Sequence, residues 1–269
     1  MNYIRNILNS RSTNGGNFFL QLKKIIGFKP KNKTLPVILT VIHPSYFPSI
    51  PLCARVAASD VIVWADSFLF KKQSDINRTP IKTINGKIWL SIPVLQKGLG
   101  QQEVRAAKID NHQPWSKKHL HTLEKNYRNS PYFYQYWDEL SRLFLHVDDF
   151  LDPFLFRSAS FIFDKFLFSK KIILSSDLPQ VKNRSRRVVA WLKATHCDTY
   201  LMVRAEKPLI DLHNRYNLSF FQFTAKIYHQ QYFVFIYPLS ALDLLLNEGP
   251  FSIDIISKGI DIQPYSEDH

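Results

Sequence analysis

Apolar and polar positions alternate along the chain in a pattern that predicts strands separated by helices. Residues 37–42 and 61–65 are two β-branched apolar runs. Between them, Ser49 is placed to cap a helix that has Pro51 near its first turn. This order of strand, polar loop, helix and strand predicts a parallel βαβ unit.

The remainder of the chain continues this alternation. Asn85-Gly86, between two apolar runs, predicts a two-residue β-hairpin turn. Helical spacing follows, and helices are expected to begin near Trp115, Pro131 and Asp149. Later strands are expected at 171–175, 199–203 and 219–224, and later helices at 183–193 and 240–247. The pattern predicts an α/β fold: a mainly parallel, Rossmann-like sheet with flanking helices, a β-hairpin insert and a helical middle region.

Positive charge is concentrated near the N-terminus. The formal net charge is +13, and residues 1–34 contain seven Lys or Arg and no acid. Apolar residues of this segment share one helical face. We therefore expect a basic amphipathic N-terminal extension over 1–34, a single α/β domain over 35–258 and a polar tail over 259–269. The extension has three possible roles: docking on the domain itself, contact with an anionic membrane, and contact with RNA.

Several protein classes are not expected. No apolar run approaches the roughly 18 residues that span a bilayer, and no signal peptide is evident. Two cysteines, Cys53 and Cys197, are too few and too far apart for a zinc site or a disulfide framework. Glycine-rich phosphate loops and standard catalytic signatures are absent from the sequence.

We expect a cytoplasmic protein, with the extension as a route to the inner membrane surface, and neither a metal nor a cofactor. Nucleic acid is not an expected partner, because the rest of the chain is only mildly basic.

Candidate catalytic residues follow the predicted strands. His43 comes directly after the first strand, and Asp66 follows the second, while Tyr46 in the loop after His43 is a candidate for substrate binding. Ligands of open α/β sheets bind at the carboxyl ends of the strands. His229 is expected just beyond a later strand. His43 and His229 are therefore candidate general bases near neutral pH, although single histidines are more often structural.

Other polar residues are candidates for substrate binding. Lys71, Asn77 and Arg78 share a loop and suit a carboxylate or phosphate, with a solvated turn as the alternative. His119 belongs to a basic cluster at a helix start, which suits a phosphate or a solvated helix face. Asp243 and Asn247 are four residues apart on one predicted helix. They could bind a ligand hydroxyl or hold that helix to the rest of the protein.

Five ordered blocks match the motifs of a known family. The blocks are Ile42-His-Pro-Ser-Tyr-Phe-Pro48, Asp60-Val-Ile-Val-Trp-Ala-Asp-Ser-Phe-Leu-Phe70 with Asn77-Arg-Thr79, Trp89-Leu-Ser-Ile-Pro-Val94 after Gly86, Trp115-Ser-Lys-Lys-His119 with Ser130-Pro-Tyr-Phe133, and Leu239-Ser-Ala-Leu-Asp-Leu-Leu-Leu-Asn-Glu-Gly249. In this order they resemble the WbqC-like proteins of bacterial surface-polysaccharide gene clusters, over about residues 37–256. The chain departs from the family pattern where Ile42 occupies its histidine position, where Ser67 replaces its second aspartate, and where Met202-Val-Arg-Ala-Glu206 lacks its glycines.

The resemblance implies a role in surface-polysaccharide (O-antigen) biosynthesis on the cytoplasmic side. The leading hypothesis is a transferase that forms an amide by acyl or aminoacyl transfer to the amino sugar of a sugar nucleotide. His43 or His229 would be the base, and Asp66 would be its orienter or a partner for the amine. The contacts to the anionic part would be Lys71, Asn77, Arg78 and His119. An activated acyl donor is the implied second substrate. The alternatives are a non-catalytic binding or assembly protein of the polysaccharide machinery and a nucleotidyltransferase-like enzyme.

Overall fold

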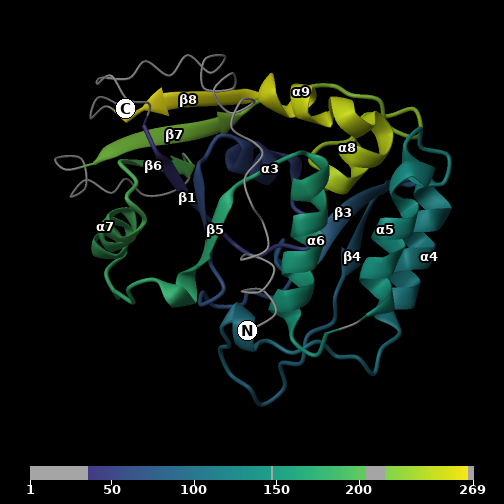
Figure 1. Cartoon of the computed structure of the whole chain (residues 1–269). Helices are drawn as coiled ribbons and strands as arrows, with labels where there is room; N and C mark the ends of the chain where they lie inside the picture. The colour runs from purple at the N-terminus through teal and green to yellow at the C-terminus, as the bar shows by residue number, and fades with distance from the viewer. Residues whose placement is uncertain (1–35, 147, 204–215, 266–269) are drawn as a thin grey trace.

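A computed structural model describes residues 36–146, 148–203 and 216–265, and it confirms the predicted α/β fold (Figure 1). The described residues form one sheet of six strands in the order β5-β2-β1-β6-β7-β8. The strands are β1 (Ile38–Ile42), β2 (Val61–Trp64), β5 (Lys171–Leu174), β6 (Thr199–Val203), β7 (Asn217–Phe223) and β8 (Ile260–Pro264). The first five strands of this order run parallel, and β8 pairs antiparallel with β7.

The strand order reverses beside β1. The chain passes from β1 to β2 on one side, and β6 later joins the other side of β1. Strands β1 and β2 consist almost entirely of buried apolar residues, as expected for central strands of a parallel sheet. The gap between β1 and β6 is therefore a topological switch point, where neighbouring crossovers leave the sheet toward opposite faces.

Helices cover both faces of the sheet. α3 (Ile50–Ala57), α6 (Leu151–Lys165), α8 (Ala241–Glu248) and α9 (Ser252–Ser257) contribute to one core together with Ile38, Ile42 and Trp64. α7 (Arg184–Thr195) packs Trp191 and Leu192 against the opposite face. Figure 1 shows α7 across the sheet from α3 and α6. Short 3-10 turns occur at η1 (Val104–Ala106), η2 (Ser175–Asp177) and η4 (Gly249–Phe251).

The predicted hairpin insert and helical middle region are both present. β3 (Arg78–Thr83) and β4 (Gly86–Ser91) pair antiparallel as a separate ribbon, with Gly86 at a positive φ of 104°. Glycine adopts this backbone conformation without the steric cost that a Cβ would bring. α4 (Trp115–Tyr127) and α5 (Phe133–Leu145) follow and pack on each other beside the hairpin (Figure 1).

The structure differs from the sequence-based expectations mainly at element ends. The segment expected as a polar tail contains β8, because alternate residues Ile260 and Ile262 pack against the main core while the backbone pairs with β7. Ser49 occupies the N-cap position of α3, but its side chain forms no capping hydrogen bond.

The expected N-terminal extension over 1–34 lies outside the described residues. Within the described ranges, no helix combines the length and apolarity needed to cross a bilayer.

Candidate ligand-binding site

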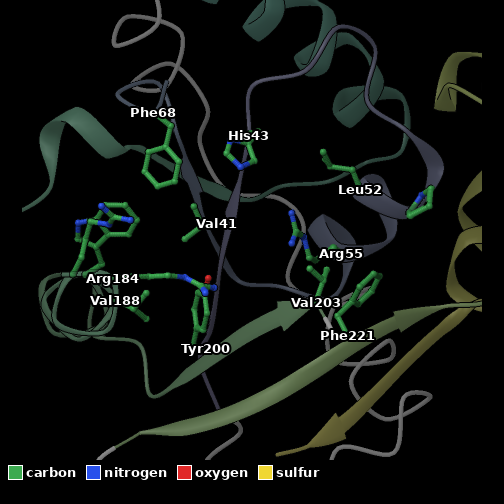
Figure 2. A pocket seen from close by; sticks show the side chains of 13 residues that line it. Val41, His43, Leu52, Arg55, Phe68, Arg184, Val188, Tyr200, Val203 and Phe221 are labelled. Atoms are coloured by element: carbon green, nitrogen blue, oxygen red, sulfur yellow. The ribbon is translucent and has the colours of Figure 1, made fainter. Parts of the chain in front are cut away.

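A pocket of about 630 Å³ opens beside the switch point (Figure 2). Val41 and His43 of the β1 end and Val203 at the end of β6 line its floor and rim. In Figure 2, α3 with Leu52 lies on one side of the pocket, and α7 lies on the other. This pocket thus lies where open α/β sheets bind their ligands.

The pocket is strongly basic. Arg55 projects from α3, while Arg184 and Arg187 project from the first turn of α7, and His43 adds an imidazole. The described lining residues include no Asp or Glu. Arg184 and Arg187 share a helix face because they are three residues apart. The N-terminus of α7, which Asn183 caps through Arg186 N at 3.0 Å, adds a partial positive charge. Together these groups favour an anionic ligand.

Arg187 is held in place by aromatic rings. Its guanidinium carbon lies 5.0 Å from the ring centre of Phe68 and 5.6 Å from that of Trp191, within cation–π range. Phe68 also contacts the His43 ring edge-to-face at 5.5 Å. Burial lowers the pKa of Arg187, and the charge of Arg184 lowers it further. An arginine stays protonated under such conditions, so an incoming anion would relieve repulsion between the two guanidinium groups.

The other walls of the pocket are apolar or aromatic. Val41, Val188 and Val203 line it together with the rings of Tyr200 and Phe221. Apolar surfaces with a few charged groups at fixed positions are typical of sites for small organic ligands. The pocket therefore suits a molecule that combines phosphate or carboxylate groups with a ring, such as a nucleotide or a nucleotide-linked sugar.

Among the predicted site residues, His43 lines this pocket, and the others lie in separate clusters. Asp66 is buried at the end of β2, where its Oδ1 accepts hydrogen bonds from Ser175 Oγ at 2.8 Å and Ser176 N at 2.9 Å. These bonds fix η2 and the end of β5 against the end of β2. The predicted role of Asp66 as an orienter of His43 remains a prediction.

Tyr46 and His119 form a buried pair. The Tyr46 hydroxyl lies 3.1 Å from His119 Nδ1, and the two rings stack. Burial lowers the pKa of His119 to about 4, although a hydrogen bond with the Ser91 backbone opposes the shift. His119 is therefore neutral at physiological pH and brings no charge to an anion. The pair joins the loop after β1 to α4.

The loop residues Asn77, Arg78 and Lys71 lie around the hairpin. Asn77 Nδ2 donates to Ile92 O at 2.9 Å, and the Arg78 guanidinium lies 4.2 Å from the Trp89 ring centre. Asn77 Oδ1 and Arg78 Nε are buried without a hydrogen-bond partner, whereas Lys71 is exposed. None of the three lines the pocket. Their predicted contact with an anion stays a prediction.

Asp243 lies at the centre of a buried network. Its carboxylate accepts hydrogen bonds from Tyr127 at 2.7 Å and Tyr228 at 2.8 Å, and Asn247 Nδ2 donates to its backbone oxygen at 2.8 Å. Burial raises the pKa of Asp243 to about 6, while the tyrosine hydrogen bonds and the charge of Lys82 oppose the shift. His229 is exposed nearby, and its backbone N donates to Glu248 at 2.7 Å. The contacts of Asp243 and Asn247 hold α8 to its neighbours.

The pocket arginines were missed by the sequence analysis. The run Asn183-Arg-Ser-Arg-Arg187 was visible as a helix start, but nothing in the sequence showed that it faces β1. Arg55 lies on the helix that was predicted after Ser49, but the sequence did not show which face of this helix is exposed. Lys82 was missed as well, since alternation along β3 does not distinguish a buried lysine from an exposed one. No cluster of three or more His, Cys, Asp or Glu arranged to hold a metal occurs in the described ranges.

Replacing Asp152 by asparagine is expected to raise the free energy of unfolding by about 1–3 kcal/mol at about pH 8. Asp152 is buried, and burial raises its pKa from 3.8 to about 7, although the hydrogen bond from Trp64 Nε1 at 2.8 Å opposes the shift. A group whose pKa is raised by folding stabilises the folded state at pH values below its unfolded-state pKa. This stability is lost as the pH rises through its folded-state pKa. Asparagine keeps an acceptor for Trp64 and never ionises.

Urea denaturation at about pH 4 and about pH 8 measures this effect. The gain should vanish at the lower pH, where Asp152 is already protonated. Asp149→Asn, an exposed site three residues away, is the matched control and should change little. A D152N protein less stable than wild type at about pH 8 would show that the carboxylate has an essential charged role.

Comparison with known proteins identifies the family. The model of the WbqC-like protein family matches residues 43–255. The uncharacterized protein Rv1507c of Mycobacterium tuberculosis is 30% identical over 107 residues, which cover 40% of this chain and 46% of that protein. Ribonuclease 3 of Zunongwangia profunda is 66% identical over 32 residues, 12% of this chain and 13% of that protein. The chain thus spans less than half the length of either relative, and no solved structure matches it. Because the family match covers most of the chain, the protein belongs to the WbqC-like protein family.

Proposed function

We propose that the protein is a transferase of surface-polysaccharide (O-antigen) biosynthesis that binds a sugar nucleotide in the pocket. The transferred group is an acyl or aminoacyl group, and its acceptor is an amine on the sugar. One observation carries this proposal: three arginines and a histidine converge on a pocket with apolar and aromatic walls at the switch point. Membership of the family, whose gene-cluster setting is surface polysaccharide, supports the same function.

The charges and walls of the pocket match the parts of such a substrate. A nucleoside diphosphate carries negative charge on consecutive phosphates, and arginine forks bind phosphate oxygens in pairs. Arg184 and Arg187 lie on one face of α7, and Arg55 faces the pocket from α3. The rings of Tyr200 and Phe221 offer surfaces on which a base or a sugar ring can pack.

In this proposal His43, which lines the pocket, acts as the general base. In the proposed step the sugar amine attacks the carbonyl carbon of the activated acyl donor, and a C–N bond forms. His43 accepts the proton that the amine loses, and the leaving group departs with the electron pair of its bond to the carbonyl carbon. A pocket arginine beside the carbonyl oxygen would stabilise the negative charge that develops there. We propose that this reaction takes place in the cytoplasm, because the proposed nucleotide-linked substrate is polyanionic.

Replacing His43 by glutamine is expected to lower turnover roughly a hundredfold while leaving the Kd for the sugar nucleotide nearly unchanged. Glutamine keeps a polar side chain of similar size but cannot accept the proton. The assay incubates the protein with a nucleoside diphosphate amino sugar and the small-molecule fraction of native cells, and mass spectrometry detects the acylated product. His121→Gln, an exposed site on α4, is the matched control. Wild-type turnover in H43Q would remove His43 from the mechanism.

A second candidate is a non-catalytic sugar-nucleotide-binding protein of the polysaccharide machinery. It is favoured by the position of Asp66, which is bonded to Ser175 and Ser176 and does not line the pocket. Calorimetric binding of nucleoside diphosphate sugars without any product in the turnover assay would favour this second function.

A further inference from the structure

The loop over residues 230–236, here called the apolar loop, displays large side chains to solvent in a fixed conformation. Phe233 is fully exposed, and Val234 is 71% exposed. The Gln230 side chain closes the loop across its base, because its Oε1 accepts from Ile236 N and its Nε2 donates to Ile236 O, both at 2.9 Å. The exposed residues at the tip thus belong to a loop that is closed by its own hydrogen bonds.

A buried lysine fixes the tip itself. Lys82 is 2% exposed, and its ammonium donates to Gln230 Oε1 at 3.1 Å and Tyr232 O at 3.2 Å, and also to Val234 O. The two carbonyl groups that flank Phe233 are therefore both bound by one buried ammonium group. A change of the backbone at Phe233 would break these hydrogen bonds, so Lys82 stabilises the loop conformation in which Phe233 is exposed.

Exposed apolar residues and lysines occur in the segments around the loop, together with the Glu248 carboxylate that accepts from His229 N. Gln231 Nε2 bonds to Asn129 O at 3.1 Å, which places the loop by the turn between α4 and α5 (Figure 1). Ile227 is 83% exposed before the loop, and Ile84 at the hairpin turn is 74% exposed. Ile84 is two residues beyond Lys82, about 7 Å along an extended chain. Residues 76–102 and 216–242, which form the hairpin and the loop region, contain no Asp or Glu but include Lys87 and Lys226.

We propose that the apolar loop docks on an anionic lipid surface, with Phe233 and Val234 inserted among the headgroups and the neighbouring lysines facing lipid phosphates. Exposed aromatic and aliphatic side chains beside basic residues are the combination that binds such interfaces. Neither segment contains an acidic residue, and Glu248, which accepts from His229 N directly before the loop, adds one carboxylate there. The attraction to an anionic surface therefore rests on the neighbouring lysines together with the inserted apolar side chains. The proposal is independent of the pocket, because no residue of the loop lines it.

Sedimentation of the full chain with vesicles tests this proposal. The vesicles contain phosphatidylglycerol and phosphatidylcholine in equal parts, and vesicles of phosphatidylcholine alone are the reference. Wild-type protein should bind the anionic vesicles more strongly, and Phe233→Ser should weaken that binding by about tenfold. Leu145→Ser is the matched control, because Leu145 is 78% exposed at the other end of α5 from the turn that contacts the loop. It should bind like wild type, as both variants keep residues 1–34.

A second measurement places the loop in the lipid directly. Brominated lipids should quench the added fluorescence of Phe233→Trp and leave that of Leu145→Trp unchanged. Equal vesicle binding by wild type and F233S, or no binding by wild type, would overturn the proposal. Equal losses in F233S and L145S would overturn it as well, since the loop would then have no special part.

Discussion

Replacing Arg184 and Arg187 together by alanine is expected to weaken binding of a nucleoside diphosphate sugar by about a thousandfold. A hydrogen bond to a charged group contributes about 1.5–3 kcal/mol, and each arginine supplies at least one such bond to a phosphate. The two side chains lie on the same face of α7 and both line the pocket. Isothermal titration calorimetry of the double variant and of wild type measures the loss.

Single substitutions and a distant arginine make this test specific. Arg187→Lys should already lose affinity, because lysine keeps the charge but loses the planar group that packs beside Phe68 and Trp191. Arg142→Ala removes an exposed arginine from the last turn of α5 and should bind as wild type does. If the double variant retained wild-type affinity while keeping its fold, the ligand would bind elsewhere on the protein.

Replacing Lys82 by methionine is expected to lower the free energy of unfolding by about 3–5 kcal/mol near neutral pH. Methionine fills the space of the alkyl chain but leaves Tyr232 O and Val234 O without the donor they have in Lys82, while Gln230 Oε1 keeps only its bond from Ile236 N. It also removes the positive charge that lowers the pKa of Asp243. Without the charge of Lys82, less interaction energy would offset the cost of burying the ionised Asp243 carboxylate.

The pH dependence of this loss follows from Asp243. Burial raises its pKa from 3.8 to about 6. The protonated form of Asp243 therefore stabilises the fold below about pH 4, and this stability is lost as the pH rises through about 6. At about pH 4 Asp243 is protonated and gains nothing from the charge of Lys82, whereas at neutral pH it is ionised. The cost of K82M should therefore be smaller at the lower pH. Guanidinium denaturation at both pH values provides the measurement, with Lys87→Met on exposed β4 as control. A loss in K82M no larger than in K87M would contradict the structural role of Lys82.

Much of the fold followed from local sequence signals. The two β-branched runs around the first helix predicted β1, α3 and β2, and Asn85-Gly86 predicted the hairpin, because both features are decided within a few residues. β8 was missed because its pairing partner β7 lies about forty residues earlier, and its own sequence is half polar. An edge strand of this kind is specified by the core that it covers more than by its own propensity.

The candidate site was predictable only where strand position decides it. His43 lies at the pocket because it directly follows β1, and the ends of parallel strands form the ligand-binding edge. Arg55 and the α7 arginines come together only because β6 is inserted beside β1, which no local pattern reveals. Asp66 and Asp243 illustrate the opposite problem. A carboxylate that holds neighbouring segments and one that binds a substrate can occupy the same place in a sequence pattern.

Mass spectrometry of the surface polysaccharide tests the central claim most directly. The native organism would carry either the wild-type gene or an allele with His43→Gln, and the protein levels of the two strains would be matched. The proposed transferase predicts that one sugar residue loses a single acyl or aminoacyl substituent while chain length stays the same. A polysaccharide of unchanged mass and length in the H43Q strain would contradict the account.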